Sequence, residues 1–343
     1  MAPEHRDATD SGYYQGARVL VTGAAGFIGI NLVQELSSRG AQVTALDLPS
    51  ADFTHTPEGV RIVRADILDK TSLARFLPET DYVFHLAART DLSGRTLEDY
   101  AVNFDGTENV IRAIASAARP KRFVLYSTQL VVGIFNETRF IGPAEPYRTK
   151  TLYGQSKILA EKIAASCCQQ NQISYTIIRP TSVYGPHGKQ PYRDFMLTIR
   201  NGRYFHVGKA DNLVSMAHVT NVVDQTLLLA LEARAAGQVF YANDLHPYTM
   251  REFADAAAEY WGHSIRTLPD VAVYPAAYLM GALKLLGLPM PLYPFRLKNI
   301  KANYCYDIGN SIELGYVPRY GLRDGVKTTL DWYCRNDRSF QAS

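Results

Sequence analysis

The stretch VTGAAGFIG (residues 21–29) places three glycines at GxxGxxG spacing. An apolar, β-branched run at 17–23 leads into it, and apolar residues at helical spacing follow it through residue 40. Glycines between a strand and a helix permit a tight turn and let the backbone approach a pyrophosphate. The free N–H groups at the helix start favour phosphate. The turn therefore predicts a dinucleotide site that includes Gly23, Gly26, Phe27, Ile28 and Gly29.

Two aspartates near the ends of the next strand-like runs extend this prediction. Asp47 ends the run 41–48, 18 residues after Gly29. A carboxylate there can bind both ribose hydroxyls and repels a 2′-phosphate, which favours NAD over NADP. Asp66, with Ile67 beside it, closes the run 59–67 and is predicted near the adenine. The alternative for Asp66 is a turn-forming aspartate.

Strand-like runs alternate with helical patterns through residue 185, which predicts parallel βαβ units. The expected fold class is α/β, a doubly wound parallel (Rossmann) sheet with a smaller C-terminal α/β substrate lobe. The later strand-like runs are 81–88, 121–128 and 174–185, and the helical ones 71–77, 98–118 and 152–170. The expected divisions are a flexible arm (1–15), an NAD-binding domain (16–186, with a return segment at about 216–243) and a substrate lobe (187–215 and 244–335).

A tyrosine and a lysine lie four residues apart in TLYGQSK (151–157). On a helix, Tyr153 and Lys157 share one face. A phenol with a pKa of about 10 is a poor base at neutral pH, but a neighbouring ammonium stabilises the phenolate and lowers that pKa. The pair is a candidate for proton transfer. Two neighbouring surface side chains are the alternative, because a single YxxxK is common.

Two polar residues upstream favour the catalytic interpretation. Thr128 ends a strand-like run 25 residues before Tyr153 and can hydrogen-bond the same substrate oxygen. Asn103 lies in a predicted helix, where its amide can hold a water that relays protons to Lys157. The predicted catalytic residues are Thr128, Tyr153, Lys157 and Asn103.

Taken together, the motifs resemble the extended branch of the short-chain dehydrogenase/reductase superfamily, the NAD-dependent epimerase/dehydratase family. The resemblance spans about residues 17–333 and rests on Asp47, TGAAGFIG (22–29), HLAA (85–88), VNFDGT (102–107), YST (126–128), YGQSK (153–157) and RPTSVYGP (179–186). It implies hydride exchange with NAD, in which Tyr153 moves the proton, Lys157 tunes it and Thr128 orients the oxygen. Further implied cofactor contacts are Leu86, Ala87, Ala88, Tyr153, Lys157, Pro180, Ser182 and Val183.

The chain departs from several patterns within that family. Members that dehydrate or decarboxylate nucleotide sugars usually carry an acid just after the Thr128 position, where this chain has Gln129 and Leu130. Nucleotide-sugar members usually have an asparagine at the Ser182 position and a diphosphate-binding arginine at the Val214 position. Substitutes for that arginine remain among Arg193, Arg200, Arg203, Lys209, Arg296, Lys298 and Lys301.

The sequence looks more like 3β-hydroxysteroid-dehydrogenase-like and dihydroflavonol-reductase-like members, which act on apolar alcohols and ketones. An apolar segment at 271–295 fits an apolar pocket or lid, whereas core packing of the smaller lobe is the simpler interpretation and insertion at a membrane surface a third. Its candidate lining residues are Tyr274, Tyr278, Met280, Leu283, Leu286 and Met290.

The predicted function is therefore NAD-dependent hydride transfer to or from a secondary alcohol or ketone of an apolar, steroid- or flavonol-like substrate. A nucleotide-sugar 4-epimerase or ketoreductase with the same Thr128, Tyr153 and Lys157 is the first alternative. A non-catalytic NAD(H)-binding protein is the second.

Composition restricts the partners. A net charge of +3 without charge runs gives no case for nucleic acid, and four cysteines without a CxxC pair argue against a metal site or disulfides. The polar N-terminus is no signal peptide, and no uninterrupted apolar run reaches membrane-spanning length. We expect a cytoplasmic protein with a small-molecule substrate. The resemblance implies a homodimer through helices 98–118 and 152–170, although burial against their own sheet would explain their apolar faces equally well.

Overall fold

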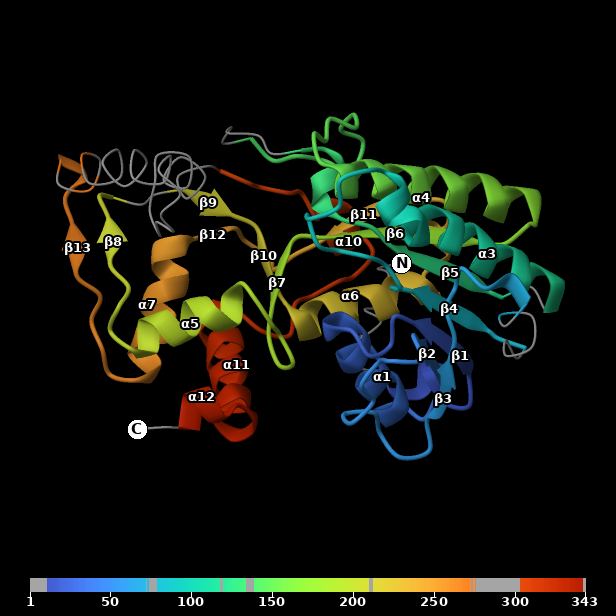
Figure 1. The fold of residues 1–343 in the computed structure, drawn as a ribbon, viewed down its shortest axis with the longest axis horizontal. Helices are drawn as coiled ribbons and strands as arrows, with labels where there is room; N and C mark the ends of the chain where they lie inside the picture. Colours follow the sequence, from blue (N-terminus) through green and yellow to red (C-terminus); the bar gives the residue numbers. More distant parts are fainter. Residues whose placement is uncertain are drawn as a thin grey trace, which may run out of the picture.

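The computed structural model describes residues 11–71, 73, 79–117, 120–133, 139–209, 212–271, 273, 275 and 303–341. Its centre is a seven-stranded sheet in the order β11-β6-β5-β4-β1-β2-β3, in which every neighbouring pair is parallel (Figure 1). The strand order reverses between β1 and β4, so the predicted doubly wound sheet is confirmed. The strands are β1 (Arg18–Thr22), β2 (Gln42–Asp47), β3 (Arg61–Arg64), β4 (Tyr82–His85), β5 (Arg122–Tyr126), β6 (Tyr175–Pro180) and β11 (Val239–Ala242).

Helices cover both faces of the sheet, since the strand side chains alternate between two apolar layers. Val19 and Val21 of β1 pack in the layer of α1 (Phe27–Ser38) and α6 (Val219–Leu231). Leu20, between them, packs in the layer of α3 (Ala101–Ala117) and α4 (Leu152–Gln170). Figure 1 shows the two helix pairs on opposite sides of the sheet. Burial on both faces explains why the strands read as continuous apolar runs.

A second group of helices packs around its own apolar cluster beside the sheet (Figure 1). It contains α5 (Tyr192–Arg200), α7 (Met250–Tyr260), α11 (Leu322–Asn336) and α12 (Arg338–Gln341), with α10 (Gly309–Ile312) lying nearer the sheet. Two-stranded pairs are β7 (Ser182–Tyr184) with β10 (Met216–His218), β8 (His206–Val207) with β13 (Thr267–Leu268) and β9 (Leu213–Val214) with β12 (Tyr248–Thr249). The 3-10 turns are Ser11–Tyr14, Glu98–Tyr100, Gln129–Val131 and Ala233–Ala235.

Several sequence predictions fall outside the described residues. They include most of the helix predicted at 71–77 and most of the apolar segment 271–295, with all six of its candidate lining residues. Arg296, Lys298 and Lys301 lie outside as well. Within the described part of the chain, no helix combines the length and apolarity needed to cross a bilayer. The proposed divisions into arm, domain and lobe stay predictions.

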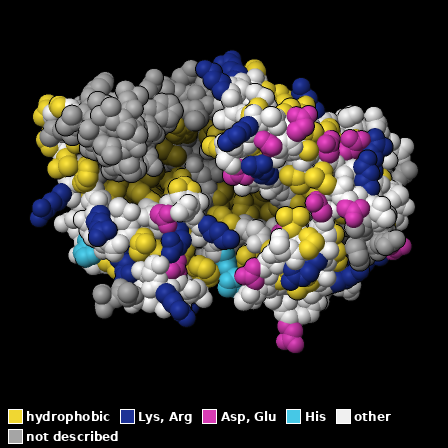
Figure 2. Space-filling model, viewed as in Figure 1, with side chains coloured by type: hydrophobic (Ala, Val, Ile, Leu, Met, Phe, Trp, Pro, Cys, Tyr) yellow, Lys and Arg dark blue, Asp and Glu magenta, His cyan; other side chains and the backbone are white. Residues whose placement is uncertain are grey.

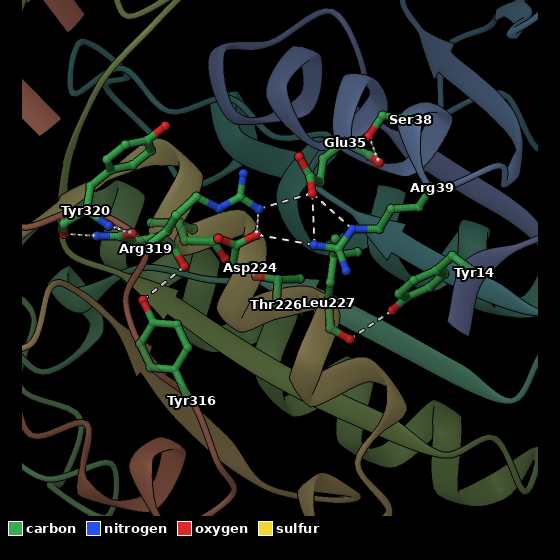
Figure 3. A network of polar contacts seen from close by, with 12 residues as sticks. Tyr14, Glu35, Ser38, Arg39, Asp224, Thr226, Leu227, Tyr316, Arg319 and Tyr320 are labelled. Atoms are coloured by element: carbon green, nitrogen blue, oxygen red, sulfur yellow. Dashed lines mark hydrogen bonds and ion pairs between the residues drawn. The ribbon is translucent and has the colours of Figure 1, made fainter. Parts of the chain in front are cut away.

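A buried ion network fastens the segment before α11 to the sheet domain (Figure 3). Asp224 of α6 accepts from Arg319 Nη2 at 2.7 Å, and Glu35 of α1 accepts from Arg39 Nη2 at 2.8 Å. Arg319 and Arg39 each reach both carboxylates. The Asp224 and Arg39 side chains are only 4% and 6% exposed, and burial raises the pKa of Asp224 to about 6. The network therefore joins three chain segments far apart in sequence.

Replacing Arg319 by methionine should lower the free energy of unfolding by about 2–3 kcal/mol in urea denaturation followed by circular dichroism, because the buried Asp224 carboxylate loses its closest cation. Breaking a buried pair costs about 3–5 kcal/mol when a charge is left unpaired, and here Arg39 still partners both carboxylates. The control is Glu259→Gln, because the Glu259–Arg323 pair is exposed and should cost less than about 1 kcal/mol. Equal losses in the two variants would contradict a stabilising role for the network.

Candidate active site

A cavity of about 870 Å³ opens at the carboxyl ends of the sheet strands, over the reversal point between β1 and β4. It collects residues from six of the seven strand ends and from the starts of α1 and α4. The sequence-predicted residues that line it are Gly23, Gly26, Phe27, Ile28, Gly29, Asp47, Asp66, Ile67, Leu86, Ala87, Ala88, Thr128, Tyr153, Lys157, Pro180 and Val183. Segments from the whole first half of the chain thus meet at one site.

The glycine-rich turn leaves no room for side chains at two positions. Gly23 has a φ of +69°, and a Cβ there would lie 2.6 Å from the Ala87 nitrogen. A Cβ on Gly29 would lie 2.2 Å from the Gly23 carbonyl oxygen. No side chain caps α1 at Gly26, so the first-turn N–H groups remain for a ligand. This cradle fits the pyrophosphate of a dinucleotide.

Asp47 and Asp66 form the acidic end of the cavity. The Asp47 carboxylate accepts from the Ala25 N–H at 2.9 Å and the Leu48 N–H at 2.8 Å, which fixes it beside the glycine turn. Asp66 accepts from the Leu68 N–H at 2.9 Å, so it forms a turn and also lines the cavity. Both interpretations of Asp66 therefore agree with its position, beyond the end of β3. Two carboxylates at this end suit ribose hydroxyls better than a phosphate.

Thr128, Tyr153 and Lys157 meet at the other end of the cavity, with exposed fractions of 8%, 8% and 3%. The Thr151 hydroxyl caps α4 by accepting from the Gly154 N–H at 3.0 Å, which places Tyr153 in the first turn. Thr128 accepts from the Leu130 N–H at 3.2 Å and hydrogen-bonds Tyr153. Accepting from the backbone leaves the Thr128 hydroxyl proton for donation. One oxygen atom of a substrate can thus contact both hydroxyls.

Burial dominates the protonation of this group. It raises the pKa of Tyr153 to about 12, and the Thr128 hydrogen bond opposes it only in part. It also lowers the pKa of Lys157 to about 8, against the attraction of Glu161. The prediction that Lys157 brings the pKa of Tyr153 below its usual value is wrong, because desolvation of the phenolate outweighs any help from the ammonium. At neutral pH the site holds a neutral phenol beside a charged lysine.

Asn103 does not line the cavity but lies fully buried behind its wall. Its Nδ2 donates to the Arg89 carbonyl oxygen at 2.9 Å and to Ser156 Oγ at 2.8 Å. Its Oδ1 accepts from the Arg89 N–H at 2.7 Å. The amide therefore ties the loop after β4 to α4. The predicted water relay to Lys157 stays a prediction.

Ser182, predicted as a cofactor contact, also lies outside the cavity lining. Its neighbours Thr181 and Val183 line the cavity, while Ser182 hydrogen-bonds Tyr192. Successive residues of an extended chain point to opposite sides, so a contact set that includes Val183 leaves Ser182 facing away. The predicted contact of Ser182 with the cofactor therefore stays a prediction, and Thr181 is the neighbouring residue that lines the cavity.

Several residues that line the cavity were not predicted from the sequence. Arg89 and Asp91, in the loop after β4, line the cavity and form an ion pair with two contacts of 2.8 and 3.1 Å. Their position directly after HLAA was the available signal, because residues that follow a parallel strand gather at its carboxyl end. The other missed lining residues are Leu46, Leu48, Ala65, Thr90, Val102, Tyr126, Ser127 and Thr181.

Comparison with solved structures agrees with the fold. UDP-glucose 4-epimerase of Thermus thermophilus, solved as a complex with NAD, superposes with a TM-score of 0.73 at 23% identity. The alignment covers 93% of this chain and 99% of that structure.

Sequence comparison identifies relatives and a family. A 3 beta-hydroxysteroid dehydrogenase/Delta 5-->4-isomerase of Mycobacterium tuberculosis is 28% identical over 338 residues, covering 92% of this chain and 90% of the relative. Short-chain dehydrogenase/reductase family 42E member 1 of Danio rerio is 30% identical over 285 residues, covering 76% and 72%. The model of the NAD dependent epimerase/dehydratase family matches residues 19–241. The motif-based prediction is confirmed, and the chain is an NAD-dependent enzyme that belongs to the NAD-dependent epimerase/dehydratase family.

Proposed function

We propose that the protein is a dehydrogenase or reductase that exchanges hydride between NAD and a secondary alcohol or ketone on an apolar, steroid- or flavonol-like substrate. The observation that carries the proposal is the meeting of Thr128, Tyr153 and Lys157 in the same cavity as the glycine cradle. Bound at the glycine turn and Asp47, NAD supplies or accepts the hydride.

The side chains divide the proton chemistry between them. In the reducing direction, Tyr153 Oη gives its proton to the substrate oxygen as that oxygen gains charge. The Thr128 hydroxyl holds the same oxygen, which keeps it within reach of Tyr153. The Lys157 ammonium stabilises the phenolate that remains on Tyr153. In the oxidising direction, Tyr153 must first lose its own proton, and the phenolate then accepts the proton of the alcohol.

The charges of the described wall favour a substrate without a diphosphate. Arg89, the guanidinium that lines the described cavity, is bound by both carboxylate oxygens of Asp91. Val214, at the position where nucleotide-sugar members carry an arginine, is buried and apolar. Arg193 binds Asp337 and Asp194. None of these three positions therefore offers an uncommitted guanidinium to a diphosphate.

Apolar surface and the named relatives support the same substrate class. On the face drawn in Figure 2, apolar side chains gather in a hollow between the sheet domain and the second helical group. Curated relatives that cover most of this chain are named 3 beta-hydroxysteroid dehydrogenases. The superposed nucleotide-sugar structure, at 23% identity, supports the fold alone.

The second candidate is a nucleotide-sugar 4-epimerase or ketoreductase with the same Thr128, Tyr153 and Lys157. It requires phosphate contacts from other cations. The candidates that remain are Arg203 and Lys209, together with Arg296, Lys298 and Lys301, which lie outside the described residues.

A homodimer through α3 and α4 also stays a prediction.

A ligand screen separates the two functions. Thermal-shift measurements with NAD present compare 3β-hydroxysteroids and flavonols with UDP-, GDP- and dTDP-sugars, and absorbance at 340 nm follows net NAD reduction. We expect stabilisation and NADH formation with an apolar alcohol. A large thermal shift with a nucleotide sugar, without net NADH, would favour the epimerase instead.

Tyr153→Phe should reduce kcat by about 100-fold or more, because general acid–base groups contribute about 10²–10⁴. Its Kd for NAD, measured by isothermal titration calorimetry, should stay close to the wild-type value. Thr128→Ser keeps a hydroxyl at the neighbouring position and serves as the control, with most activity retained. Wild-type turnover in Tyr153→Phe would exclude the proposed mechanism.

Asp47→Asn should shift cofactor preference from NAD toward NADP, measured as the ratio of kcat/KM for the two cofactors. Removing the carboxylate removes its repulsion of a 2′-phosphate. Each loss of about 1.4 kcal/mol of repulsion changes the cofactor ratio about tenfold. Asparagine keeps one acceptor oxygen, which can still accept from the Ala25 N–H, while the contact with the Leu48 N–H is lost. Asp52→Asn, on an exposed loop away from the cavity, is the control and should leave the ratio unchanged.

A further inference from the structure

A buried ion pair lies directly behind the catalytic end of the cavity. Glu161 of α4 and Arg179 of β6 are 1% and 2% exposed. Arg179 Nε donates to Glu161 Oε1 at 2.9 Å, and Nη2 donates to Oε2 at 2.7 Å. Removing two charges from water is costly, and apolar residues of similar volume often stabilise as much. The pair therefore calls for an explanation other than stability.

The remaining contacts of Glu161 lead to the cavity wall. Ser127 Oγ donates to Oε1 at 2.5 Å, and the Tyr147 hydroxyl donates to Oε2 at 2.8 Å. Ser127 lines the cavity and immediately precedes Thr128. Arg179 immediately precedes Pro180, another lining residue. One carboxylate thus holds the ends of β5 and β6 against α4.

Glu161 also lies one helical turn after Lys157 on α4, and its charge raises the pKa of Lys157 against the effect of burial. From β4, His85 faces Lys157 as a neutral ring, because burial and Lys157 lower its pKa to about 3. Thr22 hydrogen-bonds His85 Nδ1, and Thr107 hydrogen-bonds His85 Nε2. Tyr153, on the same helix, is a neutral phenol, and the Arg179 cation from β6 is bound to Glu161. Among the described residues, Glu161 is therefore the acid whose charge supports the ammonium.

We propose that Glu161 is a positioning residue for the reaction: it holds Thr128 in place through Ser127 and supports the ammonium of Lys157. The inference rests on the proposed function, because it assigns Glu161 a role in the same proton transfer. The carboxylate acts through other residues and does not itself line the cavity.

The sign of the pH effect follows from Lys157. Its ammonium is present below a pKa of about 8 and is lost above it, so activity should fall as the pH rises through that value. Glu161→Gln keeps an acceptor for Ser127 but removes the charge. The alkaline limb of the kcat profile should move down by about one pH unit, since nearby opposite charges shift a pKa by about 1–3 units. We expect kcat to fall about tenfold, with a small change in KM.

NAD binding gives a readout independent of turnover. Isothermal titration of NAD across the same pH range should show that affinity begins to weaken at a lower pH in Glu161→Gln than in the wild type, because Lys157 is a predicted cofactor contact. Glu161→Asp, which keeps the charge, should retain the wild-type limb. Ser127→Ala breaks the contact without removing charge, so it should lower kcat and leave the limb in place.

Glu35→Gln is the matched control, because Glu35 pairs with Arg39 and Arg319 and does not line the cavity. It should lower stability and leave both pH profiles unchanged. A folded Glu161→Gln with wild-type kcat and limb would overturn the inference. Should that variant not fold, wild-type kcat in Ser127→Ala would overturn it equally. Turnover retained in Tyr153→Phe would instead defeat the proposed function, whatever Glu161→Gln does.

Discussion

The contact between the glycine turn and the end of β4 is the constraint on which the site depends. Gly23, at a φ of +69°, brings the chain so close to residues 86 and 87 that a Cβ would overlap the backbone. That approach lets α1 begin beside the reversal point of the sheet, where the crossovers leave a crevice. The cavity therefore follows from a packing condition that only glycine meets.

Desolvation then sets the chemistry of the crevice. The same burial makes a phenolate costly at Tyr153 and an ammonium costly at Lys157, so their pKa values move apart, to about 12 and about 8. The phenol therefore keeps its proton until the substrate oxygen gains charge, as a general acid requires. Thr128 and Glu161 act against burial at one partner each. Thr128 and Glu161 thus partly offset the desolvation of Tyr153 and Lys157.

Two ion networks with buried members join segments on the two faces of the sheet. Glu161 and Arg179 join α4 to the ends of β5 and β6. On the opposite face of the sheet, Asp224 and Arg319 join α6 to the segment before α11 (Figure 3). Each network bridges segments that are distant in sequence, so each contributes to the relative placement of elements rather than to any single helix.

Local pattern determined much of this protein from the sequence alone. Glycine spacing, strand and helix periodicity and the YxxxK pair predicted the doubly wound sheet, the family and most of the wall, because parallel strands bring successive carboxyl ends together. Tertiary structure decided what depends on neighbours from other segments. It placed Asn103 behind the wall, turned Ser182 away from the cavity and raised the pKa of Tyr153, because hydrogen-bond partners and desolvation arise only when remote segments pack. The pairing of Glu161 with Arg179, 18 residues further along the chain, could not be predicted either, because the two residues lie on different elements.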